Sequence, residues 1–254
     1  MAPDPSSESE GGSASLSFEE AEALLGEAEM TLVGLMPNSS NYTFLVELTS
    51  PGGKAFGVYK PARGESPLWD FPAGNLHRRE IAAYRVARFL DWPLIPPTVL
   101  RSDGPHGPGS LQLYIESNPG RDFLDLRRDN PASLLPVALF DVFTNNADRK
   151  AGHCLLDPER RLWVIDHGLT FHPDFKLRTV LWDFATEPLP EPYRARLEML
   201  ALDLQRGRPL AGELRGLLSS GELGVLRRRV ELCLEPGWRF PEPTSGWSVP
   251  WPPV

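Results

Sequence analysis

Apolar and polar residues alternate in the first half of the chain in a way that favours short strands separated by turns. Residues 42–49 and 55–60 alternate between apolar and polar positions, and Ser50-Pro-Gly-Gly53 lies between them. The same arrangement recurs at 98–101 and 111–115, which flank a stretch rich in glycine and proline. A period of two indicates strands, and turn-forming residues between two strands indicate hairpins. We therefore expect two antiparallel hairpins.

Two helices are predicted beside these hairpins. Ser17 followed by Glu20 matches a capping box for a helix that runs through about Met30. Residues Leu76–Leu90 carry apolar side chains at helical spacing, and Pro93 ends the pattern. The first half is thus predicted to combine a sheet with a small number of helices.

The second half of the chain changes to the helical period. Residues 134–143 are apolar on nearly all sides, which predicts a helix buried at the centre of a domain. One hairpin is predicted at 153–156 and 162–165, because turn-forming residues separate these two apolar runs. Further helical patterns cover about 192–207, 209–218 and 221–234. Strands followed by helices, rather than strict alternation of the two, predict an α+β fold.

Both ends of the chain differ in composition from the rest. The first residues are polar, acidic and rich in serine and glycine, which is typical of a disordered tail. The last residues are rich in proline and tryptophan and are not expected to form a regular element. We expect Trp238, Trp247 and Trp251 to pack back onto the body, because exposed aromatic surface is costly. The predicted parts are a disordered tail at 1–15, a strand-rich lobe at 16–116, a helical lobe at 117–235 and a tail at 236–254.

Charge and cysteine content narrow the classes of function. The net charge of −8 argues against nucleic acid and against anionic lipid as partners, since both carry negative phosphates. The two cysteines, Cys154 and Cys233, lack the spacing of a zinc site, which favours a reducing compartment. The N-terminus has no apolar signal core, and no apolar run is long enough to span a bilayer. We expect a cytoplasmic protein without a membrane span.

Two carboxylates are predicted to lie at the same end of the hairpin in the second half. Asp148 is in the polar loop that precedes the hairpin, and Asp166 follows its exit strand. Phosphoryl transfer uses such a pair, one carboxylate for the acceptor hydroxyl and one for the metal that bridges the phosphates. Gly168 is expected to let the backbone turn sharply after Asp166.

The motifs around these carboxylates resemble those of a known superfamily. Asn-x-Asp-Arg at 146–149, followed by Ile-Asp-x-Gly at 165–168, is similar to the catalytic and metal loops of phosphatidylinositol 3- and 4-kinases. It is also similar to their bacterial protein-kinase relatives of the HipA type. Over about residues 30–205 the chain resembles an actinobacterial family assigned to that superfamily. The resemblance implies a two-lobed protein-kinase-like fold with a small β-rich N-lobe and a helical C-lobe.

The resemblance also implies roles for the second-half residues. Asp148 would be the catalytic aspartate, Arg149 would support its loop, and Asp166 would be the main metal ligand. The superfamily usually has Asn as a second metal ligand five positions after the catalytic aspartate, where this chain has His153. Imidazole suits Mn²⁺ better than Mg²⁺. The resemblance thus implies ATP and Mg²⁺ as cofactors, with Mn²⁺ as the alternative metal.

On the nucleotide side, the resemblance points to the first-half strands. Lys60 would hold the α- and β-phosphates of ATP, with Glu80 as its ion-pair partner. The segment 34–41 lies where a phosphate-covering loop belongs, but it has only one glycine. Residues 114–117 would form the adenine-side hinge. The nucleotide-binding residues expected from these two segments are Ser39, Ser40, Asn41 and Glu116.

Each of these residues also has a purely structural interpretation. Asp148 and Arg149 could form a surface ion pair, and Asp166-His-Gly could be a plain turn. Lys60 could be a solvated strand end, and Glu80 could stabilise a helix N-terminus. Asp141 is expected to tie the buried helix to the loop beneath it. His77–Arg79 and Arg227–Arg229 are expected to be solvated helix faces, with substrate contact as an alternative for the first.

The order of lysine, glutamate, hinge and two aspartate loops favours an ATP- and metal-dependent phosphotransferase. A protein or small-molecule acceptor fits the acidic charge better than a lipid. The first alternative is a nucleotide-binding pseudokinase or scaffold whose C-terminal tail binds a partner protein. The second alternative is transfer of AMP on the same fold. A histidine-based metallohydrolase fits poorly, because the histidines lack ligand spacing on a helix.

Overall fold

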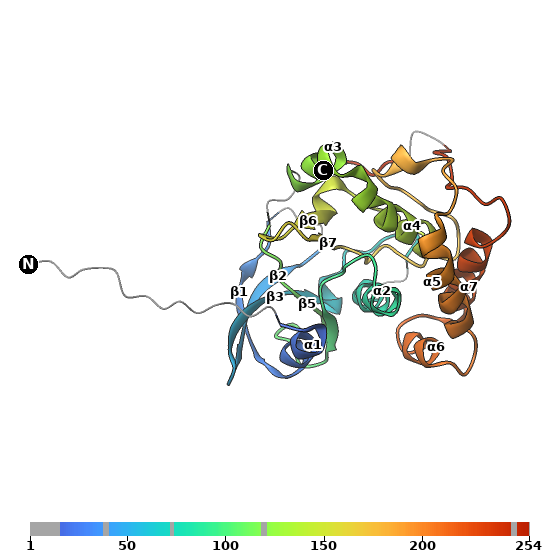
Figure 1. Cartoon of the computed structure of the whole chain (residues 1–254). Coiled ribbons are helices and arrows are strands. Elements are labelled where there is room, and N and C mark those ends of the chain that lie inside the picture. Colours follow the sequence, from blue (N-terminus) through green and yellow to red (C-terminus); the bar gives the residue numbers. More distant parts are fainter. Residues whose placement is uncertain (1–15, 38–40, 72–73, 118–120, 245–247, 254) are drawn as a thin grey trace, which may run out of the picture.

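The first part of the protein forms a five-stranded antiparallel sheet (Figure 1). The structure, a computed structural model, describes residues 16–37, 41–71, 74–117, 121–244 and 248–253. The strand order is β1-β2-β3-β5-β4, and both predicted hairpins are confirmed as antiparallel pairs. The strands are β1 (Glu29–Leu35), β2 (Phe44–Ser50), β3 (Gly53–Pro61), β4 (Thr98–Arg101) and β5 (Gly109–Leu113).

Helix α1 (Phe18–Glu27) begins at the predicted capping box, in which Ser17 and Glu20 bond reciprocally. The predicted extension of this helix to Met30 is wrong, because strand β1 begins at Glu29. Strand β1 is an edge strand whose side chains are nearly all exposed. It therefore lacks the alternation of apolar and polar positions that reveals a half-buried strand in the sequence.

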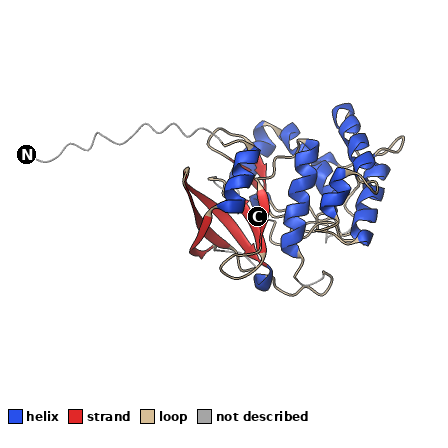
Figure 2. Ribbon diagram, turned by 90° about the horizontal axis from the view of Figure 1, so that it is seen from below, coloured by secondary structure: helices blue, strands red, loops and turns tan. Residues whose placement is uncertain are grey.

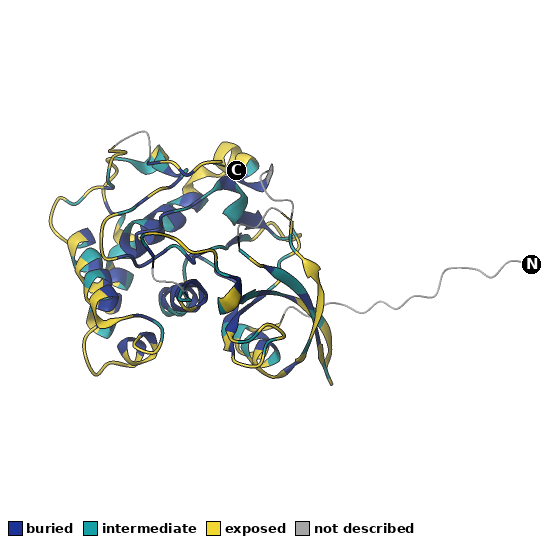
Figure 3. Ribbon diagram, turned by 180° about the vertical axis from the view of Figure 1, so that it is seen from behind, coloured by how far each residue is buried: buried dark blue, intermediate teal, exposed yellow. Residues whose placement is uncertain are grey.

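Helix α2 (Leu76–Leu90) has the predicted bounds and lies between the sheet and the helical part (Figures 1 and 3). It packs against β4 and β5 on one side and against α5 (Glu191–Asp203) and α6 (Pro209–Leu214) on the other. The prediction of a solvated face at its start is wrong, because His77 and Arg79 are buried. Arg79 forms an ion pair with Glu222 of α7 (Ser220–Cys233) and donates to the Thr170 carbonyl. Helix α2 is thereby fixed to the helical part.

Most of the remaining helices lie to one side of the sheet (Figure 2). Helix α4 is buried at the centre of this part, as predicted. Helix α3 was not predicted, because only Phe123 and Leu126 of its apolar residues are buried and charged residues dominate its sequence. The elements are α3 (Arg121–Asp129), α4 (Leu135–Thr144), β6 (Cys154–Leu156), β7 (Leu162–Val164), α5 (Glu191–Asp203), α6 (Pro209–Leu214) and α7 (Ser220–Cys233).

The C-terminal residues form no helix or strand in their described part, as expected. Trp238 packs against the main core, which confirms its predicted place. The same prediction is wrong for Trp251, whose side chain is 88% exposed. Trp247 lies outside the described residues. Across the described parts of the chain, every helix is too short or too polar to cross a bilayer.

Candidate active site

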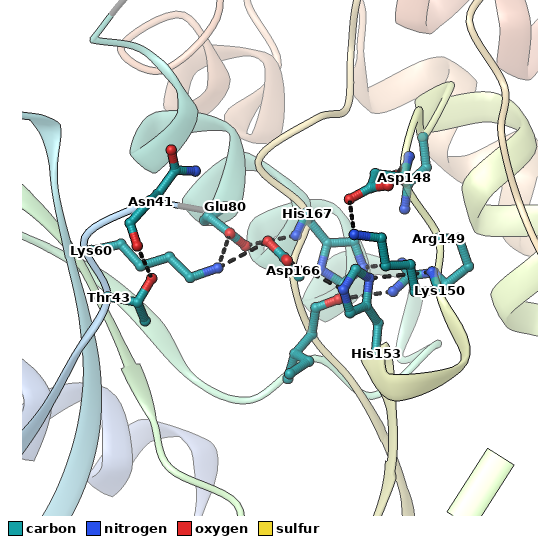
Figure 4. Close-up of polar contacts among 12 residues, drawn as sticks. Asn41, Thr43, Lys60, Glu80, Asp148, Arg149, Lys150, His153, Asp166 and His167 are labelled. Atoms are coloured by element: carbon teal, nitrogen blue, oxygen red, sulfur yellow. Dashed lines mark hydrogen bonds and ion pairs between the residues drawn. The ribbon is translucent and has the colours of Figure 1, made fainter. Parts of the chain in front are cut away.

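Side chains from both parts of the molecule meet in one ion-paired group (Figure 4). The Nζ atom of Lys60 in β3 lies 2.5 Å from Glu80 Oε1 and 3.0 Å from Asp166 Oδ1. Glu80 belongs to α2, and Asp166 follows β7. Three residues that are far apart in the sequence therefore converge on one point, as a shared site requires. The interpretation of Lys60 as a solvated strand end is wrong.

The direction of Lys60 follows from the alternation of side chains along β3. Tyr59 is fully buried in the small core between the sheet and α1. Its neighbour Lys60 therefore points to the opposite face of the sheet. Strand β5 approaches β3 closely here, and a Cβ atom at Gly109 would lie 2.4 Å from the Lys60 carbonyl oxygen. A glycine at this position permits the close approach.

Glu80 is the buried member of the group, with 4% of its side chain exposed, whereas 46% of the Asp166 side chain is exposed. Glu80 Oε2 accepts a hydrogen bond from the backbone N–H of His167 at 2.8 Å. Burial raises the pKa of Glu80, although the charge of Lys60 opposes this shift. For Lys60, burial would lower the pKa, but Asp166 and Glu80 together raise it above its ordinary value. Lys60 therefore stays charged at neutral pH.

Asp166 lies in a turn of uncommon backbone geometry. Its φ angle is 61°, in the left-handed region. The sequence analysis expected Gly168 to make the sharp turn, but the left-handed residue of the turn is Asp166. Non-glycine residues in this region are uncommon and cluster at functional sites. Burial alone would raise the pKa of Asp166, but Lys60 and His153 hold that pKa well below its usual range. Asp166 is therefore an anionic carboxylate that is partly open to solvent.

Asp148 belongs to a loop, residues 145–153, that rests on a buried network of charged and amide groups. We call it the Asp148 loop. Asp141 of α4 accepts from Arg149 Nε at 2.9 Å, and both side chains are fully buried. Asp141 Oδ1 also accepts from Asn146 Nδ2 at 2.9 Å, and Asn146 Oδ1 accepts from the Asp148 backbone N–H at 3.0 Å. The expectation that Asp141 ties the helix to the loop is confirmed.

Arg149 links the Asp148 loop to the turn that holds Asp166. Its guanidinium donates to the Ile165 carbonyl at 2.8 Å and lies 2.8 Å from His167 Nε2. The interpretation of Arg149 as a member of a surface ion pair with Asp148 is therefore wrong. A single buried cation therefore connects the Asp148 loop to the residues on either side of Asp166.

Asp148 is partly open, and its carboxylate lies beside a lysine that the sequence analysis missed. Its side chain is 29% exposed, and Oδ2 lies 3.2 Å from Lys150 Nζ. Burial raises the pKa of Asp148, with Lys150 opposing the shift and Asp166 adding to it. A raised pKa makes a carboxylate a better proton acceptor. The signal that could have identified Lys150 is a second positive charge in the same polar loop, after the buried Arg149.

His153 lies next to Asp166, with Nε2 3.3 Å from Asp166 Oδ2. Its Nδ1 accepts a hydrogen bond from the Lys150 backbone N–H at 3.3 Å, which places the ring proton on Nε2. Burial lowers the pKa of His153 to about 4, so the ring is neutral at physiological pH. In this arrangement an N–H faces Asp166. Ligation of a metal through Nε2 would require the other tautomer and the loss of the bond from Lys150.

The other predicted nucleotide-binding residues are not members of the ion-paired group formed by Lys60, Glu80 and Asp166. Asn41 lies on the Lys60 side of the site, and its Oδ1 accepts from the Ser66 backbone N–H at 2.7 Å. Glu116 is exposed after β5. Ser39 and Ser40 lie outside the described residues. Their roles in nucleotide binding stay predictions.

The described residues offer a divalent metal the partly open carboxylate of Asp166 rather than a cage of protein ligands. In the part of the chain that the structure describes, no three or more His, Cys, Asp or Glu side chains form a metal-binding group. Mg²⁺ usually takes one or two protein carboxylates and completes its shell with phosphates and water. The partly open carboxylate of Asp166 fits this kind of binding.

Sequence comparison finds a relative that matches nearly the whole chain. No protein family model matches. The chain is 39% identical over 266 residues to protein Rv2133c of Mycobacterium tuberculosis, an alignment that covers 91% of this chain and 94% of the relative. It is also 29% identical over 150 residues to phosphatidylinositol 4-kinase gamma 4 of rice (Oryza sativa subsp. japonica). That second match covers 49% of this chain and 26% of the rice protein.

Structural comparison supports a kinase-like fold. The chain is similar to the crystal structure of the proinflammatory kinase CtkA of Helicobacter pylori, with a TM-score of 0.50. The match covers 82% of this chain and 92% of the kinase, at 10% sequence identity. At this identity the similarity concerns the fold alone.

Proposed function

We propose that this chain, which belongs to the same family as protein Rv2133c of Mycobacterium tuberculosis, is an ATP-dependent phosphotransferase of the kinase type. Its fold, similar to that of a kinase, supports the proposal. The partial match to a phosphatidylinositol 4-kinase and the two aspartate motifs support placing it in the phosphatidylinositol 3- and 4-kinase-like superfamily. The acidic net charge favours a protein or small-molecule acceptor over a lipid.

A single observation carries this proposal. Lys60 from the sheet bonds both Glu80 of α2 and Asp166 beyond β7. A charged lysine held by a buried carboxylate, next to a second carboxylate that stays open, suits a triphosphate with its metal. The ion pair with Glu80 fixes the direction of the amine, and the open side of Asp166 provides space for the ligand.

We assign the nucleotide and metal to specific residues. Lys60 would contact the α- and β-phosphates, and Asp166 would hold Mg²⁺. When bound, Mg²⁺ neutralises the charge that develops on the phosphates. Asn41 and the hinge residue Glu116 remain candidate contacts of the nucleotide. His153, whose Nε2 carries the proton beside Asp166, would orient that carboxylate rather than bind the metal.

The Asp148 loop would serve the acceptor. The acceptor hydroxyl oxygen attacks the γ-phosphorus, and the bond from that phosphorus to the bridging oxygen of ADP breaks. The hydroxyl proton passes to Asp148, whose raised pKa suits it to this task. Lys150, 3.2 Å from Asp148, would attract the phosphoryl group as it moves. The products are ADP and the phosphorylated acceptor.

The test is transfer from ATP labelled in its γ-phosphate, with Mg²⁺ or Mn²⁺ present. We expect Asp148→Asn to lower the rate about 10²- to 10⁴-fold, the range of general-base loss, and Asp166→Asn to lower it at least as much. Asp129→Asn is the matched control, because Asp129 pairs with Arg128 on the surface. Equal label incorporation by the wild type and by Asp166→Asn would remove the enzymatic proposal.

The same experiment distinguishes the alternatives. Intact-mass analysis of the product shows an addition of about 80 Da for phosphate and about 329 Da for AMP. A nucleotide-binding scaffold would instead gain thermal stability with ATP, irrespective of metal, and would transfer neither group. In that case the C-terminal tail with its exposed Trp251 would be the first candidate for partner binding.

A further inference from the structure

The C-terminal residues 248–253, here called the strap, return to the helical part and bind it through their backbone. The Ser248 carbonyl accepts from the Thr179 N–H at 3.0 Å and from Trp182 Nε1 at 3.0 Å. At the other end of the strap, the Pro253 carbonyl accepts from the Ala151 N–H at 2.9 Å. The strap is therefore anchored at two points.

Both anchor points involve the Asp148 loop. Ala151 belongs to the loop itself, between Lys150 and the histidine next to Asp166. Thr179 forms a parallel bridge with Arg149. In that bridge the Arg149 N–H donates to the Arg178 carbonyl at 3.0 Å, and the Arg149 carbonyl accepts from the N–H of residue 180 at 3.1 Å. The strap thus holds the loop directly at Ala151 and indirectly through Thr179.

The composition of the strap suits a positioning role and excludes proton transfer. Its sequence, Ser-Val-Pro-Trp-Pro-Pro, contains no group that titrates near neutral pH. Three prolines fix the backbone φ angles, so little conformational entropy is lost when the strap docks. Ser248 is 5% exposed, whereas the Trp251 side chain is 88% exposed. The strap is therefore held by backbone bonds at its ends and not by its central tryptophan.

We propose that the strap positions the Asp148 loop for phosphoryl transfer, so that a segment about a hundred residues from Asp148 in the sequence is part of the active-site architecture. This inference rests on the proposed function. The residues on the nucleotide side are held by other partners, since Lys60 bonds Glu80 and Asp166 and Glu80 also accepts from the His167 backbone N–H. Loss of the strap should therefore affect the chemical step and not ATP binding.

The test compares the wild type with a variant that ends after Trp251 and so lacks the Pro253 carbonyl. Trp251→Ala is the matched control, since it removes an exposed side chain and keeps both anchor points. We expect the shortened variant to lose about tenfold in kcat while KM for ATP stays within about twofold. The control should keep the wild-type kcat. A wild-type kcat in the shortened variant, or an equal loss in the control, would overturn the proposal.

A second measurement does not depend on activity. Backbone amide exchange at Ala151 and its neighbours in the loop should be about tenfold faster in the shortened variant, because the hydrogen bond to Pro253 is gone. If the wild type transfers no phosphate, the proposed function fails, but this exchange experiment still decides whether the strap holds the loop. Unchanged exchange at 148–153 would overturn the inference. Should the shortened variant not fold, the full-length variant with Pro252→Gly and Pro253→Gly is used instead. It keeps the carbonyl at 253 but frees the backbone that presents it, so kcat should fall and exchange at Ala151 should rise in the same directions by smaller factors. Wild-type values of both in this variant would overturn the inference.

Discussion

The two loops that contribute to the candidate site are anchored in different ways. The Asp148 loop rests on Asp141, Asn146 and Arg149, all of which are fully buried. On the nucleotide side, Asn41 between β1 and β2 is anchored near the surface, where its Oδ1 accepts from the Ser66 backbone N–H. It also follows an edge strand whose side chains are nearly all exposed.

This difference indicates which side of the site is preformed. Moving the Asp148 loop would leave buried charges without partners, which is costly. Moving Asn41 would break a bond near the surface that water can replace. On the proposed function, we infer that the Asp148 loop is fixed before any ligand binds, and that Asn41 on the nucleotide side is held less firmly than the ion pair of Lys60 with Glu80.

The largest effect is expected from the buried anchor of the Asp148 loop. Asp141→Asn keeps the shape of the side chain but leaves Arg149 buried without a counter-ion. We expect the free energy of unfolding to fall by about 3–5 kcal/mol. The melting temperature should fall on the order of 10 °C. Thermal unfolding followed by circular dichroism measures both.

The control for this variant is an ion pair on the sheet. Glu47 pairs with Lys54 at 2.8 Å, with side chains that are 31% and 66% exposed. Glu47→Gln should change the free energy of unfolding by about 0–1 kcal/mol. Similar losses in the two variants would show that the buried network does not anchor the loop.

The anchor at Asp141 was predictable from the sequence because its cause is local. A carboxylate near the end of an apolar helix needs a partner, and the polar loop that follows offers Arg149. The bounds of α2 were predictable for a similar reason, since apolar spacing and the proline after the helix agree. The fold comparison supports a kinase-like arrangement that only the resemblance had suggested, because no local pattern encodes it.

A smaller effect on stability, with a large effect on activity, is expected on the nucleotide side. Lys60→Met removes the cation between Glu80 and Asp166, and we expect kcat/KM to fall about 10²- to 10³-fold. The melting temperature should change less than in Asp141→Asn, because Glu80 has a raised pKa and can take up a proton. Lys54→Met in the same strand is the control, and it should keep wild-type activity. A fully active Lys60→Met variant would contradict the assignment of the phosphates.

The features that the sequence did not reveal depend on contacts distant in the chain. Strand β1 is set by pairing with β2, and α3 is held mainly by two buried apolar residues. The strap reaches the Asp148 loop through backbone carbonyls, which carry no sequence signal. The buried state of Arg79 depends on Glu222 in a helix near the other end of the chain. Such features require knowledge of which surfaces meet.

The smallest effect concerns the metal. In the structure His153 directs an N–H at Asp166 and so adds no oxygen ligand at this position. His153→Asn places an amide oxygen there, which Mg²⁺ prefers over imidazole. We expect the ratio of activity with Mg²⁺ to activity with Mn²⁺ to rise about threefold. His106→Asn, in the exposed turn between β4 and β5, is the control and should leave this ratio unchanged. A ratio in His153→Asn equal to that of the wild type would mean that residue 153 does not face the metal, and the metal would then depend on Asp166 and the phosphates alone.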